Sequence, residues 1–264
     1  MPRDYNQGIW RVVHIDMKKT GKGKIFIIIA VIFLAAAAAV GIFLYGVSGR
    51  ERLHLRINGS EISEEEYLQA VKAVRYDVAA YFAGTYGALE EGSFWSEEYG
   101  GEIPCEKLAD EAVERLKYIH AVYGLAEEKG YIDDAGYDAL VERLEDENAS
   151  RKEKIEAGEP VYGLSEYTLD LFMEYEVSSF RERYCNDKTN EGMDLTEEEI
   201  LAYYESREWT LGDSGETADL ETARIAVERE LREKKYDEII AQREADSQVE
   251  TDREELYRFT LKNI

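Results

Sequence analysis

An uninterrupted apolar run from Ile25 to Val47 constrains this chain more than any other feature of its sequence. Its 23 residues carry no charge. As a helix they would be about 34 Å long, enough to cross a hydrocarbon core of about 30 Å. The run therefore predicts a transmembrane helix over residues 25–47. A signal peptide cleaved near Ala37–Ala39 is the alternative, since those small residues satisfy the usual cleavage rule.

The charges on the two sides of this run differ strongly. Residues 1–24 carry six basic and two acidic side chains, whereas the remainder of the chain holds nearly all of the 57 acidic residues. Positively charged flanks stay on the cytoplasmic side of a membrane. We therefore expect a single-pass protein of the cell membrane. Its basic cytoplasmic tail would be residues 1–24, and its acidic extracytoplasmic domain residues 50–264.

Composition and motifs exclude several classes of function. A formal net charge of −25, with the basic residues concentrated at the start, weighs against a nucleic-acid partner. The three histidines lack metal-ligand spacing, and no phosphate-binding loop or nucleophile elbow occurs. We therefore expect no metal, no cofactor and no enzymatic activity. The two cysteines, Cys105 and Cys185, are candidates for one disulfide in an oxidising compartment, with two buried free thiols as the alternative.

Short local signals predict that the domain is mainly helical, with one or two short strands. Residues 53–57 alternate apolar and polar side chains, the period of a strand, and Asn58-Gly59 predicts a tight turn. One short strand is not stable alone, so we expect it to dock on helices or pair with a distant segment. A long helix is expected over 220–248, and a strand with a closing turn over 249–264. Helix starts are predicted at the capping boxes Ser63–Glu66 and Thr196–Glu199, at Pro104 and at Ser165.

Four segments, in the same order along the chain, resemble exported foldases of the SurA/PrsA type. They are RINGSEISEEEYLQAV (56–71), the stretch 94–134, LTEEEILAYYESREW (195–209) and the stretch 223–250. The resemblance implies a SurA N-terminal-like helical chaperone module. In those foldases a parvulin-type prolyl isomerase domain lies between the last two elements. Here residues 210–222 are too few to bury a core of their own, so the resemblance implies no isomerase chemistry.

The predicted function is that of a membrane-anchored, holdase-like chaperone for unfolded or partly folded exported proteins. It would bind its clients by burying their apolar segments. One alternative is a membrane-tethered interaction or sensor module with one dedicated partner; another is residual prolyl isomerase activity. The candidate peptide-binding residues are the aromatic side chains Tyr81, Phe82, Tyr86, Phe94, Trp95 and Tyr99. The alternative for these six is that they belong to the core, where aromatic side chains are often buried.

Overall fold

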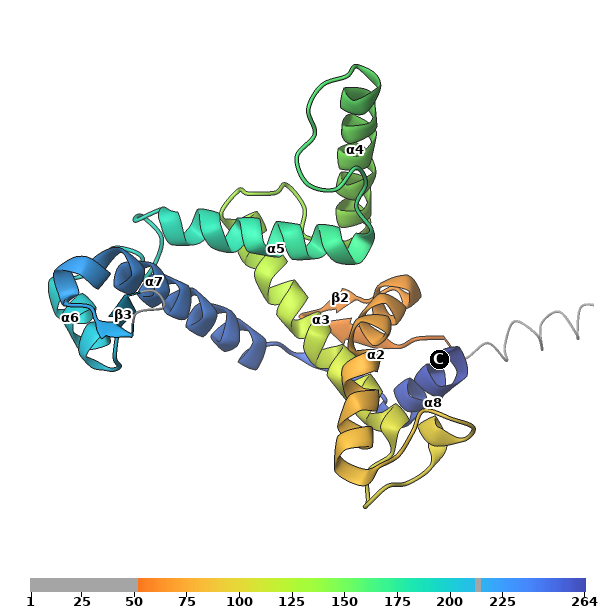
Figure 1. Ribbon diagram of the computed structural model, residues 1–264. Helices are drawn as coiled ribbons and strands as arrows, with labels where there is room; N and C mark the ends of the chain where they lie inside the picture. The colour runs from red at the N-terminus through yellow and green to blue at the C-terminus, as the bar shows by residue number, and fades with distance from the viewer. Residues whose placement is uncertain (1–51, 212–214) are drawn as a thin grey trace, which may run out of the picture. The chain divides into compact units, whose positions relative to one another are not determined.

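The helix α2 (Glu64–Tyr86) begins where the first capping box predicts it. The computed structural model describes residues 52–211 and 215–264 (Figure 1). The Ser63 hydroxyl accepts a hydrogen bond from the Glu66 backbone N–H, 3.1 Å away, and satisfies one of the free N–H groups of the first turn. The helix ends at Gly87, whose φ of 66° is favourable for glycine. A short 3₁₀ turn, η1 (Phe94–Ser96), then leads towards α3.

The helix α3 (Pro104–Glu128) starts with Pro104 in its first turn, as predicted, and packs along α2. Two further helices follow, α4 (Tyr137–Glu156) and α5 (Leu169–Asn186). The predicted start of α5 at Ser165 is wrong, because Thr168 caps that helix. The physical reason is a tertiary contact. The Asn148 side chain bonds both the N–H and the C=O of Tyr167, at 2.8 and 2.9 Å, and holds this part of the chain alongside α4.

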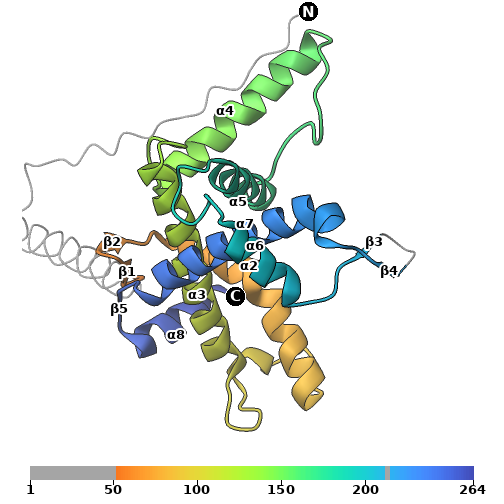
Figure 2. The ribbon, with the colours of Figure 1, turned by 90° about the vertical axis from the view of Figure 1, so that its left-hand side faces the viewer.

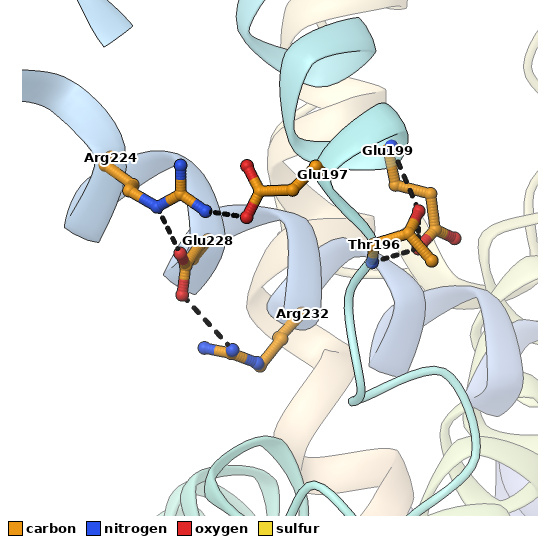
Figure 3. Close-up of polar contacts among 6 residues, drawn as sticks. All are labelled: Thr196, Glu197, Glu199, Arg224, Glu228 and Arg232. Atoms are coloured by element: carbon orange, nitrogen blue, oxygen red, sulfur yellow. Dashed lines mark hydrogen bonds and ion pairs between the residues drawn. The ribbon is translucent and has the colours of Figure 1, made fainter. Parts of the chain in front are cut away.

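The second capping box forms fully at the start of α6 (Glu197–Glu205). Figure 3 shows Thr196 and Glu199 bonded reciprocally, with Glu197 paired to Arg224 on α7 (Leu220–Ala245). Between α6 and α7 lies a small antiparallel pair, β3 (Thr210–Leu211) and β4 (Glu216–Thr217). A hairpin therefore stands where a foldase would carry its isomerase domain.

The predicted strand at residues 53–57 is β1 (Leu55–Ile57), and it pairs with a distant segment as expected. It lies between β2 (Ser60–Glu61) and β5 (Val249–Thr251) in an antiparallel sheet of order β2-β1-β5 (Figure 2). The chain then forms α8 (Arg253–Asn263), a helix where a turn was predicted. The Tyr67 hydroxyl bonds that of Thr260 in a buried contact, which fastens α8 to α2.

Three apolar clusters make up the core of residues 52–264, which form one compact unit. The first joins β1, α2, the first half of α3 and α8. The second joins the second half of α3 with α5, α7 and the start of α4. The third lies between α6 and the first half of α7. The long helices α3 and α7 each contribute to two clusters and thereby connect all three.

The structure confirms the prediction of a mainly helical fold with short strands. Within residues 52–211 and 215–264, no helix is both long and apolar enough to cross a membrane. The predicted single-pass membrane localisation therefore has no support from these residues, and we do not retain it. The predicted span at residues 25–47 and the predicted tail at residues 1–24 lie outside the described residues.

Candidate functional site

The structure gathers the six aromatic residues singled out in the sequence around one ring, that of Phe82. The rings of Tyr81, Tyr86, Phe94 and Tyr99 have their centroids 5.3 to 5.9 Å from it. Trp95 packs edge-on against Phe94 at 4.9 Å. We call these six residues the aromatic cluster. Such edge-to-face contacts each contribute about 0.5–1.5 kcal/mol beyond area burial.

The aromatic cluster divides into core members and rim members. Phe82 and Phe94 are 0% and 1% exposed and belong to the first apolar cluster, whereas Tyr81 and Tyr86 are each 38% exposed. Tyr86 can pack closely because Gly100 has no side chain: a Cβ there would lie 2.5 Å from the Tyr86 ring. The rim is therefore the part of the cluster that another molecule could touch. Its role in binding peptides stays a prediction.

Carboxylates accept hydrogen bonds from the polar groups of these exposed aromatic side chains. Tyr81 and Tyr86 both donate to Glu102 Oε2, at 2.7 Å each, which lowers the pKa of Glu102. The hydrogen bond from Tyr86 to Glu102 also raises the pKa of Tyr86 to about 12. Trp95 donates its indole N–H to Glu90, 3.1 Å away. These contacts fix the orientation of the exposed rings, so the rim is preorganised.

A second feature, which the sequence did not reveal, is a groove of about 470 Å³ between α2, α3, α5 and the start of α4. We call it the α2–α5 groove. Its apolar lining residues are mostly buried, whereas its charged ones, apart from the buried Glu66, are exposed or half-buried. The apolar lining residues include Val74, Leu116, Ile119, Leu140 and Met173; the charged ones are Glu66, Lys72, Asp77, Arg115, Asp170 and Glu174, with His120 beside Glu66.

Two polar contacts bridge the sides of this groove. His120 Nε2 lies 2.8 Å from Glu66 Oε1 and joins α3 to α2. Asp170 on α5 pairs with Lys72 on α2 at 3.2 Å and also accepts from Gln69. The groove depends on how α4 and α5 pack against α2 and α3, which the sequence alone does not show. The sequence signal for it was a row of small and charged residues on one face of α2.

Behind the groove, a buried carboxylate connects three helices. Glu176 on α5 is 6% exposed and accepts from Tyr123 on α3 at 3.0 Å and from Arg143 on α4 at 2.9 and 3.1 Å. Burial first, and then the charge of Glu176, raises the pKa of Tyr123, so its hydroxyl remains a donor. A buried, fully bonded ion pair adds directional specificity to the packing. It therefore fixes where the start of α4 stands relative to α5.

The two cysteines are free and buried in this structure. Cys105 lies in the first turn of α3, where its thiol contacts the Tyr257 carbonyl at 3.4 Å. Cys185 lies in the last turn of α5, within the second apolar cluster. The candidate disulfide is therefore not formed here. Burial raises the pKa of Cys105 to about 12 and that of Cys185 to about 11, so neither is a reactive thiolate near neutral pH.

Across residues 52–211 and 215–264, no three His, Cys, Asp or Glu side chains are placed to hold a metal ion. Burial raises the pKa of several tyrosines and of both cysteines there, and hydrogen bonds or ion pairs lower the pKa of several exposed carboxylates. These features are those of packed helices with bonded surface charges.

Comparison with known proteins decides the family. No protein-family model matches the chain. Over 204 residues the chain is 33% identical to a protein of Bifidobacterium longum subsp. longum described as a chaperone for lacto-N-biosidase; the match covers 77% of this chain and 73% of that protein. The chain belongs to the family of this lacto-N-biosidase chaperone. Among solved structures, it resembles a native GH136 lacto-N-biosidase from Eubacterium ramulus with a TM-score of 0.43 and 18% identity. That match covers 56% of this chain and 30% of that chain.

Membership of the lacto-N-biosidase chaperone family corrects one prediction and confirms another. The assignment to SurA/PrsA-type foldases is wrong, because the relative found over three quarters of the chain is a chaperone of a different kind. The prediction that the chain is not an enzyme is confirmed by the same relative. The predicted chaperone class also agrees with the family. The description of the relative names one enzyme, lacto-N-biosidase. It does not describe a holdase for exported proteins in general.

Proposed function

We propose that this protein is a dedicated chaperone whose client is a glycosidase of the lacto-N-biosidase kind. The single observation that carries the proposal is the 33% identity over 204 residues to a chaperone named for that enzyme. The alternative from the sequence, a module with one dedicated partner, is thereby favoured over a holdase for exported proteins in general. The proposal keeps the predicted chaperone function, but replaces the many exported clients with one enzyme.

The mechanism is physical, with no chemical step. A chaperone of this kind lowers the free energy of a folding client by covering apolar surface that would otherwise aggregate, at about 25 cal/mol per Å². The rim of the aromatic cluster and the α2–α5 groove both offer apolar surface held in place by hydrogen bonds. Preorganised surfaces bind more tightly because less side-chain freedom is lost on association. These two surfaces are our candidates for contact with the client.

Co-expression tests the proposal. A lacto-N-biosidase, such as the GH136 enzyme of Eubacterium ramulus, would be produced with and without this chain, and its soluble, active fraction measured. We expect active enzyme only, or predominantly, when the chain is present. As a control, an unrelated glycosidase of similar size would be co-expressed in the same way. We expect its soluble, active fraction to stay unchanged. Equal yields of active lacto-N-biosidase in both cases would contradict the proposal.

A second assay separates the dedicated chaperone from a general holdase. An unrelated, aggregation-prone model protein would be unfolded and diluted into the purified chain while light scattering is followed. A dedicated chaperone leaves its aggregation unchanged. Suppression of aggregation at near-stoichiometric ratios would instead favour the hypothesis of a general holdase. The strong negative charge would then select for basic clients.

A further inference from the structure

We propose that the α2–α5 groove binds a client segment in which apolar side chains lie next to lysine or arginine. The inference rests on the proposed function, since the occupant is part of the client polypeptide, and deepens it by naming the chemistry of that segment. Three observations carry it: the volume of the groove, its mostly buried apolar lining and the charge of its more exposed lining residues.

Size and lining match a short peptide segment. The groove has about 470 Å³, within the usual range of about 300–1,000 Å³ for binding pockets, so it holds a few side chains at a time. Leu116, Ile119 and Met173 provide apolar contacts from α3 and α5. On α2 the lining includes Ala73, an exposed residue whose small side chain leaves the entrance open.

The charged lining residues select a cationic occupant. Four carboxylates line the groove against one lysine and one arginine. Glu66 is bonded to His120, and Asp170 to Lys72.

Two further carboxylates, those of Asp77 and Glu174, are exposed and make no ion pair within the described residues. Arg115, the remaining basic residue of the lining, lies over the Tyr118 ring at 5.7 Å. The carboxylates of Asp77 and Glu174 are therefore left available to a cation brought in by the occupant.

The end of the groove near α4 is acidic as well. Burial first, followed by the negative charges of Glu66, Glu65, Asp138 and Asp170, raises the pKa of Tyr137, which lines this end. An anionic occupant would meet repulsion from these carboxylates, whereas a lysine or arginine would be attracted. Complementary charge also guides encounter and makes binding weaker as salt rises.

The test uses labelled 15-residue peptides that cover the client lacto-N-biosidase, with binding to the purified full chain followed by fluorescence anisotropy. We expect the peptides that bind to combine apolar residues with lysine or arginine, and their affinity to fall as salt is added. Replacing the basic residues of a bound peptide with glutamine should weaken binding about three- to tenfold. Peptides that bind equally well without any basic residue would overturn the proposal.

Two variants of the chain locate the site. Ala73→Trp fills the entrance and should weaken peptide binding at least tenfold, whereas Ala241→Trp, on an exposed position of α7, should not. Asp77→Asn with Glu174→Gln should weaken it about three- to tenfold. The control Glu182→Gln with Glu208→Gln changes the net charge equally outside the groove. Circular dichroism and the unfolding midpoint establish that each variant is folded.

The outcomes separate this inference from the proposed function. A folded Ala73→Trp variant that binds peptides like the unsubstituted chain overturns the groove as the site. If that chain still raises lacto-N-biosidase activity on co-expression, the dedicated-chaperone proposal stands and only the location fails. A chain that neither binds client peptides nor raises the activity overturns both.

Discussion

Replacing Phe82 with alanine tests whether the centre of the aromatic cluster is core or binding surface. The Phe82 side chain is 0% exposed and has four aromatic rings within 5.9 Å. Removing a buried phenylalanine side chain costs about 3–5 kcal/mol, because both the transfer free energy and the contacts around the new cavity are lost. The four ring contacts place our expectation for Phe82→Ala in the upper half of that range.

The loss is large compared with the stability of a typical domain, about 5–15 kcal/mol. The assay is urea unfolding followed by circular dichroism, with the free energy of unfolding taken from the midpoint and slope. Tyr76→Ala is the matched control, because Tyr76 is an aromatic residue of the same helix that is 80% exposed. For this control we expect a change of about 0.5 kcal/mol or less.

Two results would refute the reasoning. One is a loss below about 1 kcal/mol for Phe82→Ala, which would mean that the site collapses without a cavity. The other is an equal loss for Tyr76→Ala, which would mean that burial does not set the effect, because helix propensity alone favours alanine over tyrosine. The same comparison serves the functional question, because a variant that unfolds cannot report on client binding. Binding by the aromatic cluster is therefore best tested at the exposed rim, with Tyr81→Ala and Tyr86→Ala.

Three further predictions concern pH, thiols and the segment after α4. The hydrogen bond from Lys235, followed by those within the capping box, lowers the pKa of Glu199 to about 2 from 4.5, so its stabilisation is present above pH 4.5 and is lost as the pH falls towards 2. Glu199→Gln should therefore flatten the dependence of the urea midpoint on pH in that window, and superimposable curves for the two proteins would contradict this. Cys105 and Cys185 should resist iodoacetamide at pH 8 in the folded protein and react in urea, since burial raises both pKa values; rapid labelling without urea would show that they are accessible. Asn148→Ala removes both hydrogen bonds to Tyr167 and should cost about 1–3 kcal/mol and speed proteolysis within residues 157–168; an unchanged digestion pattern would mean that other contacts hold this segment.

The family assignment shows how far local signals reach. The Asn-Gly turn after residue 57, the N-cap at Ser63 and the capping box at Thr196 are all present in this fold. Each of them satisfies free backbone groups at the end of an element, which any helical protein must do. Their order along the chain therefore resembled that of a foldase, although such signals are too general to identify a family. The chaperone class was predicted only through that resemblance, and it is the lacto-N-biosidase chaperone relative that supports the class.

The sequence by itself determined where most helices begin and end, because a cap, a proline or a glycine acts within one turn of the chain. It also determined that the aromatic residues from Tyr81 to Tyr99 come together, since they are close in sequence. Only the tertiary structure decided which of them are buried: Phe82 and Phe94 lie within the first apolar cluster, and Tyr81 and Tyr86 are left at the rim. It likewise decided the start of α5 and the α2–α5 groove, because both depend on contacts between residues far apart in the chain.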